Sequence, residues 1–556
     1  MTSQTEQKAE RVHIELQRVQ TWLFSVPRLR AMVGANALLG QVLRVELPEL
    51  AKDPAMAPTI GAQWSLCQGS QWEQFPVRDA NDPLADKDDP RQDAKDGILA
   101  RDGGHFEALF AHGAAEFAQA ARERLEQELP GLRFSIKVND ERIERPGSSL
   151  SYELPVLAPC AWSGRGLSSA EVVQGSGTDK ETYAVSLDAQ RRHDAAKRAA
   201  KNKAKGKAQH ADGAGSETLS DDAADLASLL TRQTGLAKLE LAESFEKLTD
   251  EDYLAVIHAD GNGVGSQTKG MSEPDKAKFF HRNRVLLRRA LQHAMDEAAN
   301  STQGTQTCPL TVLMLGGDDV LVVCRASLAL RFVVDLCQEL KEIQKDRPES
   351  EFRLTLGVGV VFSRPSVPFH RLHEVAEKLA SSAKRLYRGM DNAQAASVVD
   401  WASYTTAWAD DPAEVRARDW VCGKDNTRRI LSRRPLRVLG SELDSLNGLL
   451  KGASAIKDAP RSQLHYLVET LRQGKTLAEL AFAELSPGTK DALTKKAGVK
   501  DVWSQQNQGE PYLTSILDLV EVLEIPRLGV KNKSGTHAAS PPTGSTEGPS
   551  KEAAHG

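Results

Sequence analysis

Two adjacent aspartates, Asp318 and Asp319, complete a Gly-Gly-Asp-Asp sequence at residues 316–319. Apolar runs flank it on both sides, at residues 310–315 and 320–323. The pattern predicts two buried strands joined by a tight hairpin, in which the glycines adopt turn conformations that side chains oppose. Two like charges at such a tip repel each other and gain nothing from the core. They are well placed instead to bind Mg²⁺, which takes oxygen ligands from one or two carboxylates and shares the rest with substrate phosphates.

Taken alone, this hairpin fits a solvated structural turn equally well, because Gly-Asp turns are common. A third aspartate favours chemistry. Residues 253–258 form an apolar run that leads into Asp260 and a glycine-rich segment at 261–265. Three carboxylates at neighbouring strand ends can hold two metal ions about 3.5–4 Å apart, one activating a ribose hydroxyl and the other stabilising the pyrophosphate leaving group. We therefore expect Asp260, Asp318 and Asp319 to be catalytic metal ligands.

The elements around these aspartates predict an α+β fold. A capping-box pattern at residues 272–275 opens a predicted helix of about 25 residues with apolar positions at helical spacing. The order that results, β-α-β-β-α-β with an added α-β, is the ferredoxin-like or palm arrangement. In it the first strand pairs beside a strand of the hairpin, which brings Asp260 to the Asp318–Asp319 pair. The other elements expected are helices at 328–343 and 369–387 and strands at 352–362 and 396–400.

Four segments together resemble the second palm of the large polymerase-like subunit of type III CRISPR effector complexes, a family related to GGDEF cyclases and class III nucleotide cyclases. They are HADGNGVG at 258–265, LMLGGDDVLVV at 313–323, LGVGVVF at 356–362, and the helix that contains Lys384. The resemblance implies synthesis of cyclic oligoadenylates from ATP with Mg²⁺ or Mn²⁺ in antiviral defence. It also implies effector-complex subunits and guide or target RNA as partners.

The resemblance further implies roles for individual residues. Lys384 matches a family lysine that contacts the triphosphate, although a solvated helix lysine would look the same. Members of the family often carry a second acidic residue two positions after the first strand's aspartate, and this chain has Asn262 there. The expected nucleotide-binding residues are Gly261, Asn262, Gly263, Gly265, Gly316, Gly317 and Lys384.

The first half of the chain repeats the pattern of strand, helix, hairpin-like region, helix and strand. Where the second half has its two aspartates, this half has Gly-Gly-His-Phe at residues 103–106. These side chains cannot hold two metal ions, so we expect a degenerate palm. In the resembling family the first palm is likewise non-catalytic and shapes a nucleotide pocket shared with the second. A lone histidine such as His105 is more often structural than catalytic, and we leave it out of the site.

The charge of the 556-residue chain excludes a generic polyanion binder, because the net charge is −5 and the isoelectric point about 6.3. A local basic run at residues 191–207 has eight Lys and Arg against one Asp. Such an alanine- and lysine-rich run is more typical of a solvated helix or flexible linker than of a nucleic-acid surface. The His193-Asp194 dipeptide within it lacks upstream metal histidines. We expect no His-Asp nuclease domain and no cleavage of single-stranded DNA.

The six cysteines are scattered without a CxxC pair, which argues against a zinc ribbon and a disulfide scaffold and fits a reducing cytoplasm. Many members of the resembling family carry a zinc-binding cysteine cluster, and this chain departs from them. The N-terminus is polar and no apolar stretch reaches membrane-spanning length. We expect a cytoplasmic protein without a membrane partner.

Residues 426–530 are rich in helical pattern and resemble the family's C-terminal helical domain, which docks onto the small subunits of the effector filament. A generic helical cap would look the same. We expect five parts: a degenerate first palm (1–160), an inter-palm linker segment with a basic helix (161–250), the catalytic palm (251–425), the helical domain (426–530) and a disordered Ser/Pro/Gly-rich tail (531–556). The C-terminal helices are expected at 436–451, 461–472, 477–485 and 512–523.

Two other functions remain open from the residues. One is a GGDEF-like synthase that makes a cyclic dinucleotide from GTP, because the sequence does not reveal which residues read the base. The other is a non-catalytic scaffold subunit that binds guide RNA and target, with its palm kept for folding. The intact carboxylate set favours an enzyme, whereas Asn262 mildly favours the scaffold.

Overall fold

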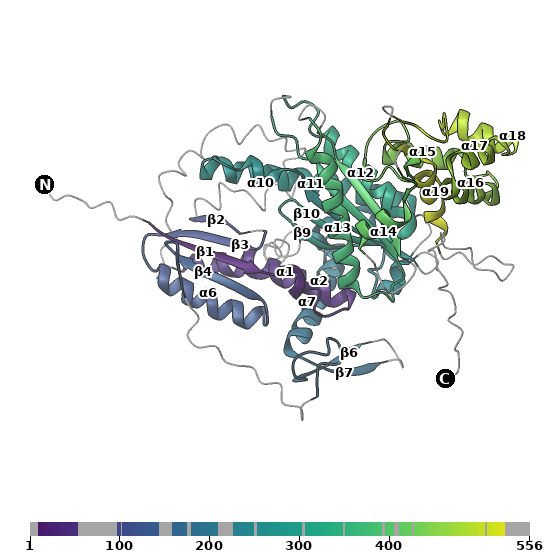
Figure 1. Cartoon of the computed structure of the whole chain (residues 1–556). Coiled ribbons are helices and arrows are strands. Elements are labelled where there is room, and N and C mark those ends of the chain that lie inside the picture. Colours follow the sequence, from purple (N-terminus) through teal and green to yellow (C-terminus); the bar gives the residue numbers. More distant parts are fainter. Residues whose placement is uncertain are drawn as a thin grey trace, which may run out of the picture.

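The computed structural model describes residues 9–53, 97–101, 103–143, 158–174, 180–209, 226–249, 253–302, 306–348, 351–391, 395–404, 411–424, 427–505 and 509–528. Within these ranges the chain is a mixed α/β protein with two main sheets, a separate β-hairpin and a group of C-terminal helices (Figure 1). The predicted disordered tail, residues 531–556, lies outside the described residues.

The second sheet carries the aspartates. Strand β8 lies in its interior and pairs antiparallel with β10 on one side and β11 on the other. The expected pairing of the first strand beside the hairpin is therefore confirmed, and its partner is the second hairpin strand, β10. Strand β11 pairs in parallel with β12. The strand order is β15 (Leu436–Arg437), β12 (Val398–Tyr404), β11 (Leu356–Ser363), β8 (Leu254–Gly261), β10 (Asp319–Arg325) and β9 (Leu310–Gly316).

Both faces of this sheet are buried, as the apolar runs of its strands require. On one face Ile257 packs in a core with helices α11 (Glu273–Ser301) and α12 (Ala329–Glu342). On the other face Val256 packs in a core with α13 (Phe369–Arg388) and with residues of the first half. The first half and α13 therefore share a core against the same face of the second sheet.

The first sheet has the order β2-β3-β1-β4-β5. Its first four strands stand in the same relative order as β9-β10-β8-β11 of the second sheet: a hairpin, then the first strand of the unit, then the last. Gly103 and Gly104 form the turn before β3 with φ values of 63° and 82°, which favour glycine. The elements are β1 (Glu10–Gln17), α2 (Leu29–Gln41), β2 (Ile98–Ala100), β3 (His105–Phe110), α6 (Ala114–Glu128), β4 (Arg133–Val138) and β5 (Glu141–Arg142).

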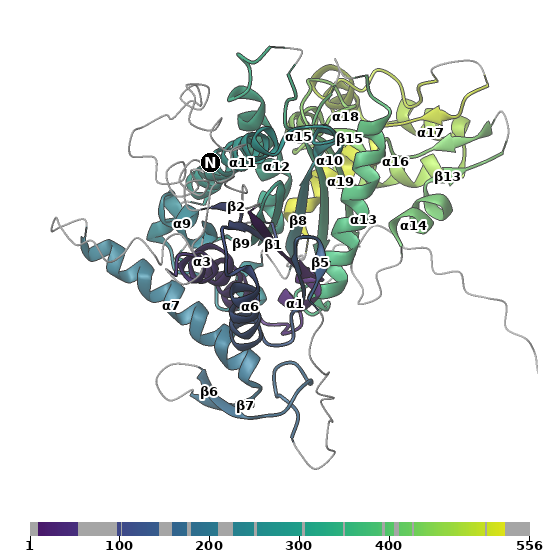
Figure 2. The ribbon, with the colours of Figure 1, turned by 90° about the vertical axis from the view of Figure 1, so that its left-hand side faces the viewer.

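The basic run is part of a packed helix at its N-terminal end. Helix α7 (Leu187–Gln209) runs along α2, close to the hairpin of β6 (Ala170–Gln174) and β7 (Glu181–Val185) (Figure 2). Arg192 is fully buried and donates hydrogen bonds to the carbonyl oxygens of Trp22 and Leu23. The interpretation of 191–207 as a solvated helix or linker is therefore wrong for its first two turns, because small alanines there let the helix approach α2 closely.

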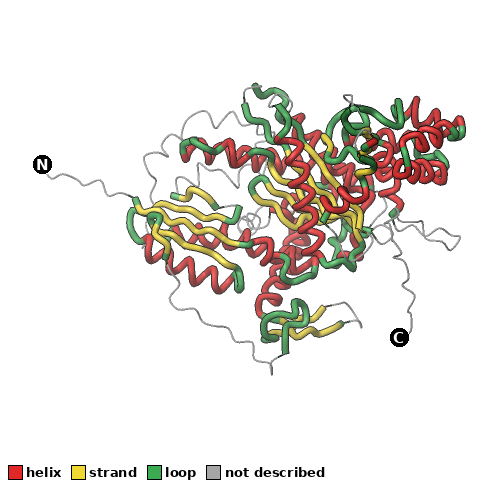
Figure 3. Tube along the Cα trace, in the orientation of Figure 1, coloured by secondary structure: helices red, strands yellow, loops and turns green. Residues whose placement is uncertain are grey.

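The C-terminal helices pack beside the second sheet (Figure 3). The expected helices at 461–472 and 477–485 are confirmed as α16 (Arg461–Gln473) and α17 (Lys475–Ala483). The one expected at 436–451 exists as α15 (Leu446–Ala455), but its predicted start is wrong, because residues 436–437 form β15 in the second sheet and the helix begins after its cap, Ser445. Likewise, the one expected at 512–523 begins with a short strand, β16 (Tyr512–Leu513), before α19 (Ile516–Glu524).

A buried arginine joins these helices to the second sheet. Arg434 forms ion pairs with Asp518 and Glu521 of α19, at 2.9 and 2.6 Å. Its guanidinium lies 4.5 Å from the ring centroid of Trp401 in β12 and 4.2 Å from that of Trp420. The predicted domain boundary at 425/426 therefore separates residues that share one core. No helix in the described part of the chain is both long and apolar enough to cross a membrane.

Candidate active site

The register of β8 and β10 brings the aspartates together. Asp260, near the end of β8, stands directly opposite Asp319, the first residue of β10. Asp318 lies in the two-residue turn before it, and its carboxylate packs over Gly261. A Cβ at Gly261 would come within 2.6 Å of the Asp318 Oδ2 atom, so only glycine leaves room for this carboxylate. All three predicted ligands thus meet at one end of the second sheet.

The pKa values of two of these buried and crowded carboxylates are raised. Burial and then the neighbouring Asp260 charge raise the pKa of Asp319 to about 8. The same two causes, burial first, raise the pKa of Asp318. The Oδ1 atom of Asp319 is buried and accepts no hydrogen bond from the described residues. Such a group lacks a positive partner, which a bound cation would provide.

Lys384 supplies part of that positive charge. Its ammonium forms an ion pair with Asp260, and the two side chains are 18% and 34% exposed. Lys384 reaches this position because α13 packs very closely on β11. A Cβ at Gly359 would stand 2.0 Å from the carbonyl oxygen of Ala376, and a Cβ at Gly357 would stand 2.5 Å from the Cγ atom of Lys384. The sequence predicts Lys384 as a phosphate contact, and the structure places it beside the carboxylates.

Asn262 anchors the glycine-rich segment after β8 to Thr355 by hydrogen bonds. This residue is fully buried, and its backbone N–H donates to the Thr355 carbonyl oxygen at 2.8 Å. Its side-chain amide donates to the Thr355 hydroxyl at 3.1 Å, while its Oδ1 atom is buried without a partner. Gly263 follows with φ of 70°. Asn262 therefore anchors the loop to Thr355, and the residue also lines the cavity beside Asp260 and Lys384.

Two cavities meet at Asp318. One, of about 560 Å³, is lined by Asp260, the 261–267 segment and Lys384, together with Tyr387 and Arg388 at the end of α13. The other, of about 590 Å³, lies between the GGDD hairpin and the first half of the chain. Each has the size of a pocket for a nucleotide-sized ligand. Gly316 and Gly317 line the second cavity, and Gly261, Gly263 and Gly265 line the first.

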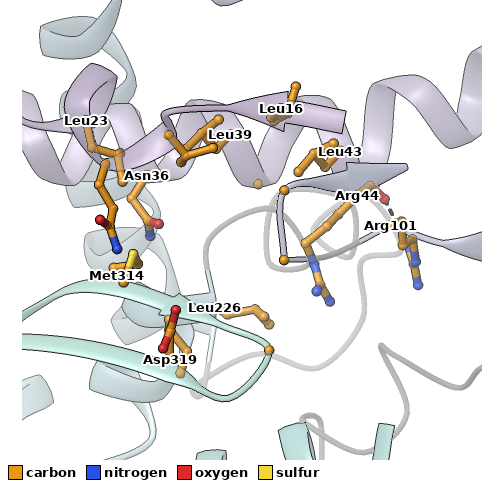
Figure 4. A pocket seen from close by; sticks show the side chains of 18 of the residues that line it. Leu16, Leu23, Asn36, Leu39, Leu43, Arg44, Arg101, Leu226, Met314 and Asp319 are labelled. Carbon is orange, nitrogen blue, oxygen red and sulfur yellow. Dashed lines mark hydrogen bonds between the residues drawn. The ribbon is translucent and has the colours of Figure 1, made fainter. Parts of the chain in front are cut away.

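The first half contributes residues to the second cavity that the sequence patterns did not single out. Asn36 and Arg44 extend from their helical segments toward the hairpin that carries Asp319, as Figure 4 shows. Arg101 lies beside Arg44 and donates to its carbonyl oxygen at 2.9 Å. A buried arginine in an otherwise apolar helix, Arg44, is the one signal that could have identified this wall.

In the first sheet, His105 begins β3 as Asp319 begins β10, and it stands opposite Glu15. His105 also stacks on His13 with ring centroids 5.5 Å apart. Burial is the main cause that lowers the pKa of His105. In the parts of the chain that the structure describes, no group of three or more His, Cys, Asp and Glu side chains forms a ready-made metal cage.

Comparison with known proteins identifies this part of the chain. Residues 253–392 match the family model of the Cas10/Cmr2 second palm domain, a segment that includes Asp260, the hairpin and Lys384. The chain is therefore similar, through this palm domain, to the large subunit of type III CRISPR effector complexes, which confirms the resemblance seen in the sequence.

Solved structures show more distant likeness. Csm1 from T. onnurineus is 12% identical with a TM-score of 0.44, over 95% of this chain and 70% of that chain. A Csm1–Csm4 cassette in complex with cA4 is 12% identical with a TM-score of 0.47, over the same shares. The apo Csm1–Csm4 cassette is 14% identical with a TM-score of 0.41, again over 95% and 70%. No curated protein matches the sequence.

Proposed function

We propose that this chain is a metal-dependent nucleotidyltransferase that joins ATP into a cyclic oligoadenylate second messenger in type III CRISPR-like antiviral defence. The observation that carries the proposal is the register pair of Asp260 and Asp319 within a segment that matches a Cas10/Cmr2 second palm. Burial and then the facing Asp260 charge raise the pKa of Asp319, and such a crowded carboxylate destabilises the fold unless a cation binds it.

The donor set fits Mg²⁺ or Mn²⁺. Asp260, Asp318 and Asp319 offer oxygen ligands only, and Mg²⁺ typically binds one or two carboxylates together with substrate phosphates and water. The unpartnered Oδ1 atom of Asp319 is a candidate ligand atom. When bound, the metal would lower the pKa of the attacking ribose hydroxyl and neutralise the leaving pyrophosphate.

The other residues would bind and orient the nucleotide. The backbone amides of residues 261–265 line the cavity beside Asp260 and would approach the triphosphate closely, because three of the five residues are glycines. Lys384 would pair with phosphate oxygens as a point charge. Gly316 and Gly317 would let a nucleotide approach the hairpin without meeting a side chain. No side chain in this arrangement is needed as a general base.

The first half would form the opposite wall as a degenerate palm. Its Asn36, Arg44 and Arg101 line the cavity that reaches Asp318 and Asp319. A second nucleotide held there would present its ribose hydroxyl to the triphosphate bound near Lys384. Two adjoining cavities are what a reaction that joins two nucleotides requires, because donor and acceptor must be bound at the same time.

A place in an effector complex is the natural setting for this activity. Helices α15 to α19 would dock onto small subunits of such a complex, with guide and target RNA as the other partners. Exposed apolar side chains on α16 and α17, Tyr466 at 53% and Leu480 at 55%, are compatible with a partner surface there.

The test is an incubation of purified protein with Mn²⁺ or Mg²⁺ and each labelled nucleoside triphosphate, with and without partner subunits and target RNA. We expect pyrophosphate release and oligoadenylate products from ATP, lost in the Asp318→Ala/Asp319→Ala double variant. Asp346→Ala, an exposed aspartate outside the site, is the matched control. Products from GTP alone would favour the cyclic dinucleotide synthase. Inertness under every condition would leave the non-catalytic scaffold.

A further inference from the structure

Lys384 occupies the place where a cation is expected in the candidate site. Its ammonium is ion-paired with Asp260. Burial and then the Asp260 charge raise the pKa of Asp318 and Asp319, and the Lys384 charge partly opposes that rise. The lysine thus acts electrostatically on all three carboxylates, although it contacts only one. A lysine that is only 18% exposed and is paired with Asp260 competes with any other cation for the oxygens of that carboxylate.

Lys384 also has an alternative acceptor close by. A Cβ at Gly357 would lie 2.5 Å from the Lys384 Cγ atom and 2.9 Å from the Oδ1 atom of Asn262, so both side chains flank the same glycine. That Oδ1 atom is buried without a hydrogen-bond partner. It is neutral, so it can accept from the ammonium without holding it as strongly as a carboxylate does. An aspartate at this position would retain the lysine by charge.

We propose that Lys384 is an internal counter-ion of the metal site, which must leave Asp260 when a divalent cation binds. This inference rests on the proposed function, because it presumes that the three aspartates bind a metal. In the metal-free protein the ammonium reduces the repulsion between the carboxylates. Once displaced, it is free to turn toward Asn262 or toward the phosphates that arrive with the metal. Binding of metal and of phosphate would thus be coupled through a single side chain.

The proposal makes an unusual prediction, which is that removing a basic residue from the site strengthens metal binding. The test measures the affinity for Mn²⁺ alone, without nucleotide, by electron paramagnetic resonance of the free ion. Lys384→Met keeps most of the side-chain length and removes the charge, and Lys384→Gln keeps a hydrogen-bond donor. Lys378→Met, on the same helix but paired with Glu374 and Asp411, is the matched control.

We expect both Lys384 variants to bind Mn²⁺ about fivefold more tightly than the wild type, because Mn²⁺ no longer has to break a partly exposed ion pair. The affinity of Lys378→Met should equal that of the wild type. Melting in chelator should show lower stability of the Lys384 variants, and saturating Mn²⁺ should raise their melting temperature more than that of the wild type. The melting curves also establish that the variants fold.

The contrary outcomes are distinct. One contrary outcome is that the wild type binds Mn²⁺ and the Asp260→Asn variant does not, while the Lys384 variants bind it equally or more weakly than the wild type. This result overturns the counter-ion role and leaves the proposed metal site standing. Absence of Mn²⁺ binding to the wild type and to every variant overturns the counter-ion role and the two-metal proposal together.

Discussion

Gly359 of β11 and Ala376 of α13 lie so close that a Cβ on the glycine would stand 2.0 Å from the alanine's carbonyl oxygen. Two residues earlier on the same strand, the atoms nearest to a Cβ at Gly357 would belong to the side chains of Lys384 and Asn262. One glycine therefore allows the helix to pack on the sheet, and the other leaves room for the lysine that pairs with Asp260. The two can be separated by experiment.

We expect Gly359→Ala to destabilise the fold by about 3 kcal/mol, since the new methyl group overlaps backbone that cannot move aside. Gly357→Ala should cost less, about 1 kcal/mol, because a flexible side chain can shift, but it should displace Lys384 and weaken ATP binding. Denaturant unfolding and nucleotide titration measure the two effects. Equal loss of stability in both variants would show that the contact with the helix backbone is not the limiting one.

The sequence predicts the hairpin and its partner strand well, because both depend on local patterns. An apolar run, two glycines and two aspartates define the hairpin, and the pairing of β8 beside β10 follows from the order of the elements. Boundaries that depend on tertiary contacts are less accurate. Strand β11 begins at Leu356 and not at residue 352, and the last strand, β12, extends to Tyr404.

The wall formed by the first half could not be predicted in this way. Asn36 and Arg44 lie in helical segments whose pattern shows only which face is buried, and they meet the hairpin through contacts far apart in the sequence. The role of Asn262 was also hidden. The sequence marks it as a nucleotide-binding candidate where the family often has an acidic residue, whereas its contact with Thr355 depends on how β11 begins.

Arg434 is expected to be critical for joining the C-terminal helices to the palm. It is almost completely buried, and its ion pairs with Asp518 and Glu521 lie between two tryptophan rings. Arg434→Ala would leave Asp518 buried without its charge partner, at a cost of about 3–5 kcal/mol in the free energy of unfolding. Chemical denaturation measures this change.

Arg371→Ala is the matched control for this prediction. Its ion pair with Glu374 is exposed on the surface, so the expected change is below about 0.5 kcal/mol. A loss of comparable size in the two variants would contradict the assignment of Arg434 as the buried link.

His373 should make the fold sensitive to acid. Burial and then the neighbouring His258 lower its pKa to about 3, from the 6.5 that is usual for a histidine. The histidine packs 4.7 Å from the ring centroid of Phe24, and its Nδ1 atom lies 3.8 Å from the Glu377 carboxylate. The unfolded chain binds the proton first as the pH falls, so stability is complete above about pH 6.5 and decreases from there toward pH 3.

Replacement of His373 by phenylalanine should therefore reduce the pH dependence of stability between pH 7 and 5. The slope of the unfolding free energy against pH should fall by up to about 1.4 kcal/mol per pH unit, which denaturant unfolding at several pH values measures. His370→Gln, on the exposed side of the same helix, is the control for effects on α13 itself. A slope in this range that is the same for His373→Phe and the wild type would mean that other groups carry the acid sensitivity.

Helix α7 is expected to be necessary for the position of α2, and hence for the first-half wall of the cavity. Gly34 of α2 lies against α7 so closely that a Cβ there would stand 1.8 Å from the carbonyl oxygen of Arg192. Gly34→Ala should destabilise the fold by about 3 kcal/mol despite the better helix propensity of alanine. Because Asn36 lies two residues further along α2, nucleotide binding should weaken too.

Gly488→Ala, where a Cβ meets nothing within 4 Å, is the control and should leave unfolding nearly unchanged. Unaltered unfolding and unaltered nucleotide affinity in Gly34→Ala would show that α7 is dispensable for placing α2.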